Sequence, residues 1–331
     1  MLAYIARRFV IMIPMLVVLS IISFVIIQLP PGDYLTTYIR AMQATGEVFN
    51  EAEIEALKVQ YGLDQSIYVQ YGKWMANILL RGSFGRSFYW GREVNELLAE
   101  RLPITIFVSL SSLIVVYVLA IPIAIFSAIY KYSWFDYVAT TFGFIGLAMP
   151  SFMMALVISW LFFLITGGMV TSLFSIPFRD APWSFAKFLD LLSNVWLPIV
   201  IIGLSGTAGL IRTLRATLLD ELSRPYVVTA RSKGLTERRL LLKYPVRIAM
   251  NPVFSTIGWL LPGLINGGVI VGIVLNLQMI GPVLMQATLS QDMYLAGSIV
   301  LILGVLTVVG TLISDILLAW LDPRIRYGAE G

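Results

Sequence analysis

Long apolar runs are the feature of this sequence that most constrains its fold. Hydrophobic residues make up 58% of the 331 residues, charged residues make up 13%, and the mean hydropathy is +0.85. A helix that crosses a bilayer needs about 20 consecutive apolar residues, because its backbone must satisfy its own hydrogen bonds in lipid. Six runs reach that length, near residues 9–29, 103–130, 136–166, 195–216, 250–275 and 294–320. The sequence therefore predicts an all-α, polytopic membrane protein with six transmembrane helices.

The distribution of positive charge predicts the orientation in the membrane. An even number of spans places both termini on one side. That side carries 14 of the 23 Lys and Arg residues, nine of them between Arg212 and Arg247. Of the other nine, seven are spread over the long segment at 30–102, which counts little in the positive-inside rule. We therefore expect both termini and the basic loop to be cytoplasmic.

The segment between the first two spans has a helical pattern. Asn50 and Ser66 are each placed to cap an amphipathic helix, and a third short helix is expected at Val94–Leu98, before Pro103. The second helix would carry one apolar face, formed by Ile67, Tyr71, Trp74, Met75, Ile78 and Leu79. These faces are too narrow for an independent core, so we expect them to lie on the membrane and on other helices. Contact with a soluble external partner is the alternative.

The basic loop reads as a helix, a glycine turn and a second helix. Ser223 is expected to cap the first helix, with Pro225 in its first turn, where a missing N–H costs little. Gly234 is expected to adopt the left-handed conformation that ends this helix, and Thr236 to cap the next one, which runs to Arg247. Such an arrangement is typical of a surface to which another protein binds. Contact with anionic lipid is the alternative explanation for its charge.

The composition excludes several function classes. The chain has no Cys and no His, which removes thiol nucleophiles, imidazole bases and Cys/His metal sites. It also lacks a G-x-x-x-x-G-K-[ST] phosphate loop, so another subunit must bind any ATP that is used. We expect no enzyme activity, no cofactor, no metal and no nucleic acid partner. An ion-coupled secondary transporter would need polar ligands at mid-membrane, which these spans almost lack, whereas a membrane scaffold or receptor subunit is harder to exclude.

The loop sequence resembles that of a known family. Residues Tyr226–Arg239 are similar to the cytoplasmic coupling loop, or "EAA" loop, of ABC importer permeases of the dipeptide/oligopeptide/nickel (OppB/DppB-type) systems. Further similar motifs follow in the same order along the chain, at Tyr4–Arg8, Pro30–Asp33, Tyr61–Gln65, Gln70–Tyr71, Gly85–Phe88 and Leu321–Arg326. The resemblance implies a type I ABC importer permease fold in the cytoplasmic (inner) membrane of a prokaryote. It divides the chain into an N-terminal helix at 1–29, an extracytoplasmic helical segment at 30–102 and a five-helix permease core at 103–331, with its coupling loop at 217–247.

The resemblance also implies partners and site residues. The permease would form a heterodimer with a second, homologous permease, and would bind two ATPase subunits, which hold ATP and Mg, and an extracytoplasmic substrate-binding protein. The coupling helix would run from about Leu222 to Lys233, and small Ala230 would let it approach the ATPase closely. The residues implied in ATPase coupling are Tyr226, Thr229, Ala230, Arg231, Lys233, Gly234 and Leu235.

One departure from the family pattern concerns the cargo. Residues Gly272–Gly281 lack the acidic residue and the aromatic–Pro–Gly pattern that are typical of peptide permeases. The sequence therefore leaves oligosaccharides open as cargo beside oligopeptides.

Polar and glycine residues within the spans suggest a transport path. Pro262–Gly268 is expected to interrupt or loosen the fifth span and expose Asn266, although close helix packing explains its glycines equally well. Asn276 and Gln278 are further candidates for the path. Asp315 is the one carboxylate well inside a span, and we expect it to pair with a basic residue of the loop rather than bind cargo.

Overall fold

The computed structural model describes residues 2–28, 59, 65–87, 89–168, 172–179 and 181–321. The described residues are almost entirely helical, apart from a short hairpin of β1 (Arg86–Ser87) and β2 (Arg92–Glu93) and a 3₁₀ turn at Ile176–Phe178. The helix predicted from Asn50 lies outside them, except for the single residue 59, as do the motifs at 30–33 and 322–326. Tertiary contacts divide the chain into two compact units.

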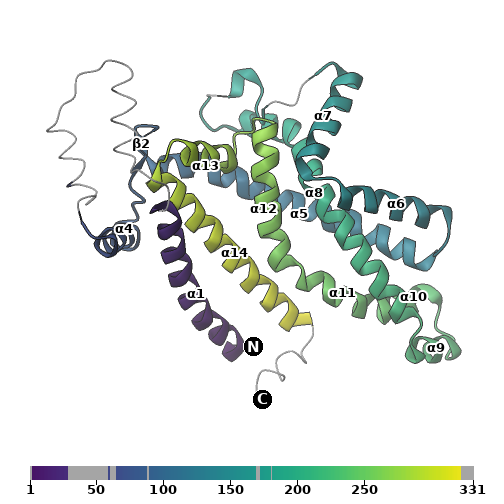
Figure 1. Cartoon of the computed structure of the whole chain (residues 1–331). Helices are drawn as coiled ribbons and strands as arrows, with labels where there is room; N and C mark the ends of the chain where they lie inside the picture. Colours follow the sequence, from purple (N-terminus) through teal and green to yellow (C-terminus); the bar gives the residue numbers. More distant parts are fainter. Residues whose placement is uncertain are drawn as a thin grey trace. The chain divides into compact units, whose positions relative to one another are not determined.

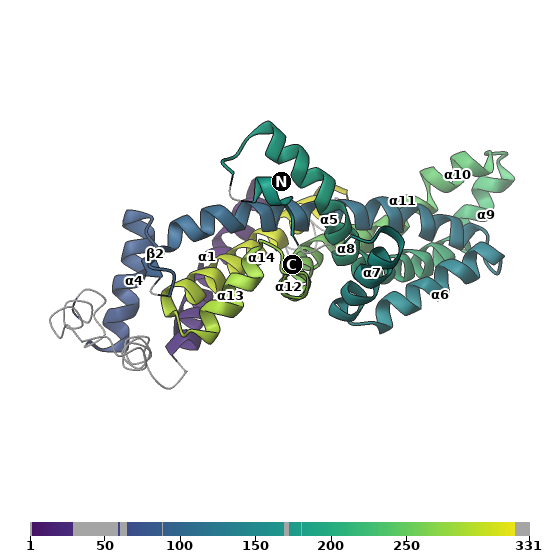
Figure 2. The ribbon, with the colours of Figure 1, turned by 90° about the horizontal axis from the view of Figure 1, so that it is seen from above.

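The first unit comprises Met1–Phe9, Thr105–Gln278 and Val309–Gly331. It contains most of α5 (Val94–Ile129), together with α6 (Trp134–Ala148), α7 (Ser151–Thr166), α8 (Phe185–Leu222), α11 (Pro245–Ser255) and α12 (Ile257–Val274). Helix α8 packs against α6 and α11, as Figures 1 and 2 show, and α12 packs against α7 and α8. A small residue also lets α8 approach α5, because a Cβ at Gly203 of α8 would lie 3.3 Å from the backbone oxygen of Ser112 of α5.

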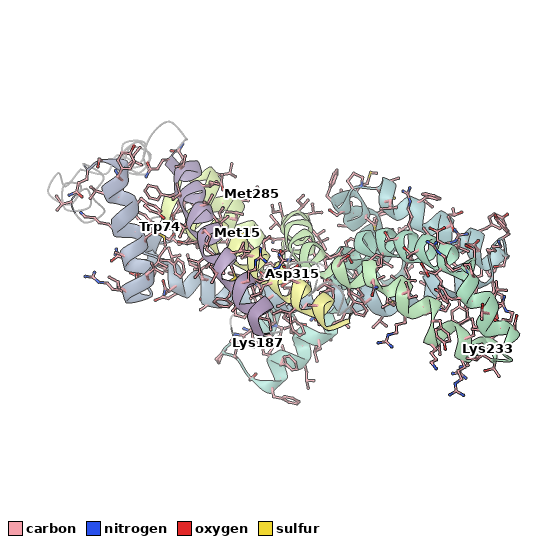
Figure 3. All side chains as sticks on the ribbon, turned by 90° about the horizontal axis from the view of Figure 1, so that it is seen from below. Met15, Trp74, Lys187, Lys233, Met285 and Asp315 are labelled. Carbon is pink, nitrogen blue, oxygen red and sulfur yellow. The ribbon has the colours of Figure 1, made fainter. Side chains whose placement is uncertain are left out.

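The second unit comprises Val10–Ile104 and Met279–Val308. It contains most of α1 (Leu2–Gln28), α4 (Ile67–Arg81), α13 (Ile280–Leu289) and the first half of α14 (Met293–Leu321). Trp74 of α4, labelled in Figure 3, is buried against Phe24 of α1 and Leu301 of α14. This confirms that α4 lies on other helices.

Part of the predicted apolar face of α4 packs against other helices. The helix begins after Ser66 as expected, and Tyr71, Trp74, Met75 and Ile78 pack in the unit. In contrast, the side chains of Ile67 and Leu79 are 52% and 74% exposed. These two side chains do not pack in the unit, and their contact with the membrane stays a prediction.

The hairpin is fixed to the start of α14. Ser87 Oγ donates a hydrogen bond to Asp292 Oδ2 at 2.5 Å, and the backbone N–H of Tyr89 donates to the same oxygen at 3.2 Å. Gly85 adopts φ +94°, and a Cβ there would lie 3.2 Å from the ring of Tyr294. The motif that begins at Gly85 therefore has a structural explanation: the backbone needs glycine, and Ser87 binds a buried carboxylate.

Four helical segments within the described residues are long and apolar enough to cross a membrane: Ile5–Val25, Val94–Ile129, Phe185–Leu204 and Tyr294–Leu317. The run predicted at 136–166 is instead two helices, α6 and α7, which meet at an angle of 116°. Pro150, which lacks an N–H, stands at this break. Counting this bent pair as one span gives five.

Two expected helix boundaries were wrong. The short helix at Val94–Leu98 is not separate, because its apolar residues pack against α13 and α14 and α5 continues through Pro103. The run at 250–275 is interrupted at Thr256, between α11 and α12, rather than at Pro262–Gly268, through which α12 is continuous.

Candidate functional site

The basic loop after α8 forms a short helical hairpin. Helix α9 (Pro225–Ser232) and helix α10 (Glu237–Lys243) follow the end of α8, as Figure 1 shows. Pro225 occupies the first helical position, as predicted, because its fixed φ suits that site. The predicted caps were wrong in part: Arg224 is the N-cap of α9, while Ser223 ends α8 and its hydroxyl donates to the carbonyl of Asp220.

The second helix also differs from the expectation. Thr236 does precede α10, but its side chain makes no capping hydrogen bond. The helix ends at Lys243, and a new helix, α11, begins at Pro245, so the predicted helix to Arg247 is two helices. Pro245 lacks an N–H and therefore favours this start of a new helix.

Gly234 ends α9 in the way predicted. Its φ is +77°, in the left-handed region. The N–H of Gly234 donates to the carbonyl of Arg231 at 3.0 Å, and the N–H of Leu235 donates to the carbonyl of Ala230 at 3.4 Å. This pair of bonds is a Schellman motif, in which glycine at the turn satisfies the last carbonyls of the helix. Gly234 therefore sets the direction in which the chain leaves α9.

A small apolar core holds α9 against α10. Val227, Ala230 and Leu240 are buried together, with Tyr226 and Leu235 packed against them. Ala230 is only 8% exposed. Its small side chain therefore faces the loop's own core, and its part in the approach to an ATPase stays a prediction.

The opposite face of α9 is exposed and carries positive charge. Val228 is 56% exposed, and Thr229, Arg231 and Lys233 are also exposed. Arg231 Nε pairs with Glu237 Oε1 at 2.5 Å, which links the two helices across the turn. Lys233, labelled in Figure 3, lies at the end of α9. Three of these exposed side chains, including apolar Val228, therefore lie on one short helix, and Lys233 follows directly after it.

Tyr226 links α9 to the end of α8. Its hydroxyl donates a hydrogen bond to Glu221 Oε2 at 2.5 Å. Burial raises the pKa of Tyr226 above its ordinary value, and the hydrogen bond to Glu221 raises it further. The phenol therefore stays neutral at physiological pH and keeps the proton that it donates. Among the implied coupling residues, Tyr226, Ala230 and Leu235 thus face the loop, while Thr229, Arg231 and Lys233 face outward.

The glycines of α12 border an apolar cavity in the first unit. Its volume is about 340 Å³. It is lined by Leu147, Ser151, Ile202, Gly206, Gly209, Leu210, Thr213, Thr256, Leu260, Gly263, Leu264 and Gly267. A Cβ at Gly263 or Gly267 would meet no atom within 4 Å, so these two glycines leave open space rather than a close helix contact.

The amide residues proposed for a path have different positions. Asn276 is exposed and has φ +51°. Its N–H donates to the carbonyl of Ile273 at 3.2 Å, and the N–H of Leu277 donates to that of Gly272 at 2.7 Å, so Asn276 ends α12 in a second Schellman motif. Gln278 is partly buried after this turn. The side chain of Asn266 lies outside the described part of the structure.

Asp315 pairs with a basic residue, as expected, but not with one from the loop. Arg8 Nη1 of α1 lies 2.9 Å from Asp315 Oδ2 of α14. The predicted loop partner was wrong because α1 lies against this part of α14 and carries Arg8 to the carboxylate.

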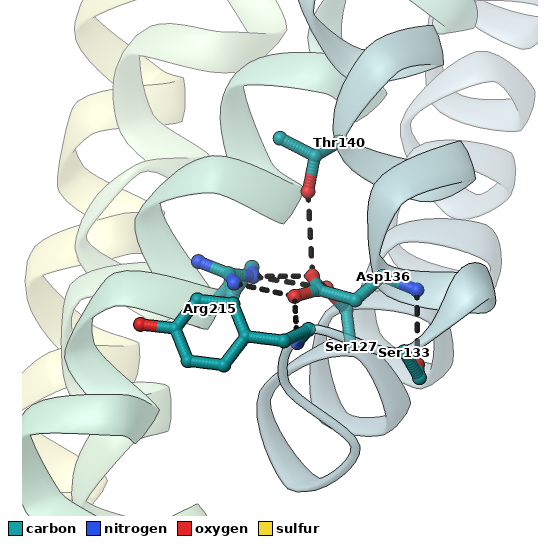
Figure 4. Close-up of polar contacts among 6 residues, drawn as sticks. Ser127, Ser133, Asp136, Thr140 and Arg215 are labelled. Atoms are coloured by element: carbon teal, nitrogen blue, oxygen red, sulfur yellow. Dashed lines mark hydrogen bonds and ion pairs between the residues drawn. The ribbon is translucent and has the colours of Figure 1, made fainter.

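One buried ion pair was not predicted from the sequence. Asp136, in the first turn of α6, is 3% exposed and binds Arg215 of α8 (Figure 4). Arg215 lies inside the run predicted at 195–216. A charged residue within a predicted span is the feature of the sequence that could have indicated this ion pair. Within the described residues, no group of three or more Asp and Glu side chains could hold a metal ion.

Comparisons with known proteins cover nearly the whole chain. The family model described as "Binding-protein-dependent transport system inner membrane component" matches residues 120–327, and a model of the N-terminal part of such membrane components matches residues 1–111. The oligopeptide transport system permease protein AppB of Bacillus subtilis is 36% identical over 330 residues, which cover 99% of this chain and 100% of AppB.

Other relatives give the same result. A putative peptide transport system permease protein of Brucella abortus is 32% identical, over 99% of this chain and 100% of the relative. The oligopeptide transport system permease protein OppB of Haemophilus influenzae is 30% identical, again over 99% and 100% of the two chains. Together with the apolar helices, these matches describe a multi-pass inner membrane protein and a transport subunit rather than an enzyme. The chain therefore belongs to the family of binding-protein-dependent transport system inner membrane components, as a permease subunit of an ABC importer.

Proposed function

We propose that this permease imports oligopeptides, using ATP hydrolysed by two cytoplasmic ATPase subunits, one of which docks on α9. It would pair with a second permease and receive its cargo from an extracytoplasmic binding protein. The observation that carries the proposal is the α9–α10 hairpin, whose own core and Schellman turn hold one face of α9 outward. A preformed helix loses little conformational entropy on docking, so it suits a contact that must transmit force.

The outward face of α9 indicates what kind of partner surface fits it. Val228 is a half-exposed apolar side chain, flanked by Thr229 and by the cations Arg231 and Lys233. An apolar groove with acidic residues at its rim would complement this face. We therefore propose that Val228 inserts into such a groove on an ATPase subunit and that the flanking cations orient it.

The cavity beside α12 is proposed as this subunit's contribution to the translocation path. Gly263 and Gly267 border it with open space at the position of a Cβ, and the hydroxyl residues Ser151, Thr213 and Thr256 lie on its wall. An apolar wall with few polar groups would hold a peptide weakly. Weak binding suits a passage that must release its cargo.

Oligopeptides are the proposed cargo because similar proteins over the full chain length are named as oligopeptide or peptide permeases. The departure at Gly272–Gly281 carries less weight, because this stretch has a structural role. Asn276 caps α12 there, and Leu277 and Met279 are buried. Oligosaccharide import is the alternative that the sequence left open.

Uptake into reconstituted vesicles tests the proposal. Vesicles that contain both permeases, the ATPase subunits and internal ATP should accumulate labelled oligopeptides when the binding protein is added. Uptake should continue after the proton and sodium gradients are collapsed and should stop with a non-hydrolysable ATP analogue. Uptake driven by an ion gradient without ATP would contradict the ATP-driven mechanism. Uptake of oligosaccharides but no peptides would contradict the cargo alone.

A further inference from the structure

The Asp136–Arg215 ion pair suggests how movement of α9 reaches the cavity. We propose that this pair makes α6 move together with α8, so that a displacement of α9 by the ATPase changes the width of the cavity. Asp136 and Arg215 would then be positioning residues for transport, without touching the cargo. The inference rests on the proposed docking of an ATPase on α9.

The geometry of the pair joins three helices at one point (Figure 4). Arg215 Nη2 lies 2.7 Å from Asp136 Oδ2, and Arg215 Nε lies 2.8 Å from Oδ1. Ser127, near the end of α5, donates a short hydrogen bond to Asp136 and accepts one from Arg215 Nε at 3.0 Å. The N–H of Tyr132 also donates to Asp136 Oδ2, at 2.8 Å. Charge-assisted hydrogen bonds of this kind are strong and directional, so they hold the carboxylate in this orientation.

The link toward the cytoplasmic hairpin is short and continuous. Arg215 precedes Leu222, the last residue of α8, by seven positions, or about 10 Å along the helix axis. Helix α8 has no break in this stretch, and its end is tied to α9 by the hydrogen bond between Tyr226 and Glu221. A displacement of α9 would therefore act on Arg215 through a rigid helix.

The link toward the cavity is equally close. Helix α6 rests on α8 at Gly146, where a Cβ would lie 3.2 Å from Ala208 Cβ. The next residue, Leu147, lines the cavity together with Gly209 and Thr213 of α8. The chain then bends by 116° into α7, whose first residue, Ser151, lies on the same wall. The relative position of α6 and α8 therefore sets part of the cavity wall.

A double substitution can distinguish the proposed role of the Asp136–Arg215 pair in transport from a role in folding alone. Removing one partner leaves an unpaired buried charge, whereas replacing both with apolar residues of similar volume is often neutral for stability. The double substitution Asp136→Leu with Arg215→Met should therefore fold and yet lack the hydrogen bonds that tie α6 to α8. Thr140→Val is the matched control, because Thr140 Oγ1 makes only a 3.3 Å hydrogen bond to Asp136 Oδ1.

The measurement is the number of cargo molecules transported per ATP hydrolysed, in vesicles that contain the complete complex. We expect the double variant to reach wild-type abundance, to bind the ATPase subunits normally and to hydrolyse ATP, but to transport roughly tenfold less per ATP. Thr140→Val should keep the wild-type ratio. An unchanged ratio in the double variant would overturn the proposal. So would a loss of abundance with a normal ratio in the complexes that do assemble, since that result would mean a structural role only.

A reversible covalent link gives a second, independent readout. The chain has no native Cys, so Gly146→Cys with Ala208→Cys places a single pair of thiols at the contact between α6 and α8. A Cβ–Cβ distance near this value is within reach of a disulfide after a small shift. Oxidation in the assembled complex should restore the transport ratio of the double variant, and reduction should abolish it again. If the disulfide forms and the transport ratio of the double variant stays low, the proposed link between α6 and α8 is contradicted.

Failure of the wild-type chain to bind the ATPase subunits would instead contradict the proposed function.

Discussion

At the scale of single residues, backbone conformation explains the residue types of Gly234 and Asn276, which a role in transport alone would not explain. Gly234 has φ +77° and no atom within 4 Å of a Cβ placed on it, so the left-handed turn is the reason for glycine rather than lack of space. Asn276 serves the same purpose at the end of α12, where φ is +51°. Asn and Gly are the two residues that tolerate this conformation best.

Two substitutions of Gly234 test whether docking of the ATPase depends on the left-handed turn. Gly234→Val should disfavour the Schellman turn by about 1–2 kcal/mol and misplace α9, because a β-branched residue strains the left-handed conformation. We expect normal membrane insertion but weaker co-purification of the ATPase subunits and reduced transport. Gly234→Asn is the matched control and should stay close to wild type. Equal behaviour of the two variants would mean that the turn has no part in docking.

At the scale of elements, the α9–α10 hairpin and α4 are expected on opposite sides of the membrane. The hairpin carries Arg231, Lys233 and further cations, whereas α4 belongs to the segment before the second span. The positive-inside rule places the hairpin in the cytoplasm. Several apolar helices lie between α4 and the hairpin in the sequence, so the side of the membrane on which α4 lies needs a test of its own.

Single Cys residues can test this topology because the native chain has none. A Cys at Tyr68, which is 87% exposed on α4, should react with an impermeant thiol reagent in intact cells. A Cys at Ser232 of α9 or at Lys131, in the turn before α6, should react only after permeabilisation. Labelling of the Ser232 variant from outside would contradict both the orientation and the docking of an ATPase on α9.

At the scale of the whole molecule, two cavities border α6 and α8, and they are predicted to differ in function. The first contains the open glycines of α12, and the second is lined by residues that include Phe142, Gly143 and Leu204. A Cβ at Gly143 also meets no atom within 4 Å. Only the first cavity is proposed as part of the path.

Filling each cavity with the same side chain tests this assignment. Gly267→Leu should lower the rate of peptide uptake several-fold while the complex still assembles, because the new side chain occupies the proposed path. Gly143→Leu makes the same change in the second cavity and should leave uptake near wild type. Neither change should break its helix, since leucine is a better helix former than glycine by roughly 1 kcal/mol. Equal uptake by both variants would contradict the path.

The sequence determined the features that depend on local chemistry. Apolar run length predicted a polytopic helical membrane protein, Ser66 and Pro225 marked helix starts, and Gly234 marked a helix end. Each of these depends on a few neighbouring residues: a backbone that must bond internally, a missing N–H, or a φ that only small residues tolerate. The family motifs of the loop were recognisable for the same reason, since they encode this local geometry.

Only the tertiary structure decided which side chains meet. Ala230 packs against Val227 and Leu240, and Asp315 meets Arg8 from the other end of the chain. Asp136 lies 79 positions from Arg215, and no periodicity within either helix indicates that the two share one buried site. Such pairings depend on the rotation and packing of whole helices. In a chain whose helices are apolar on nearly every face, the sequence pattern carries little information about that rotation.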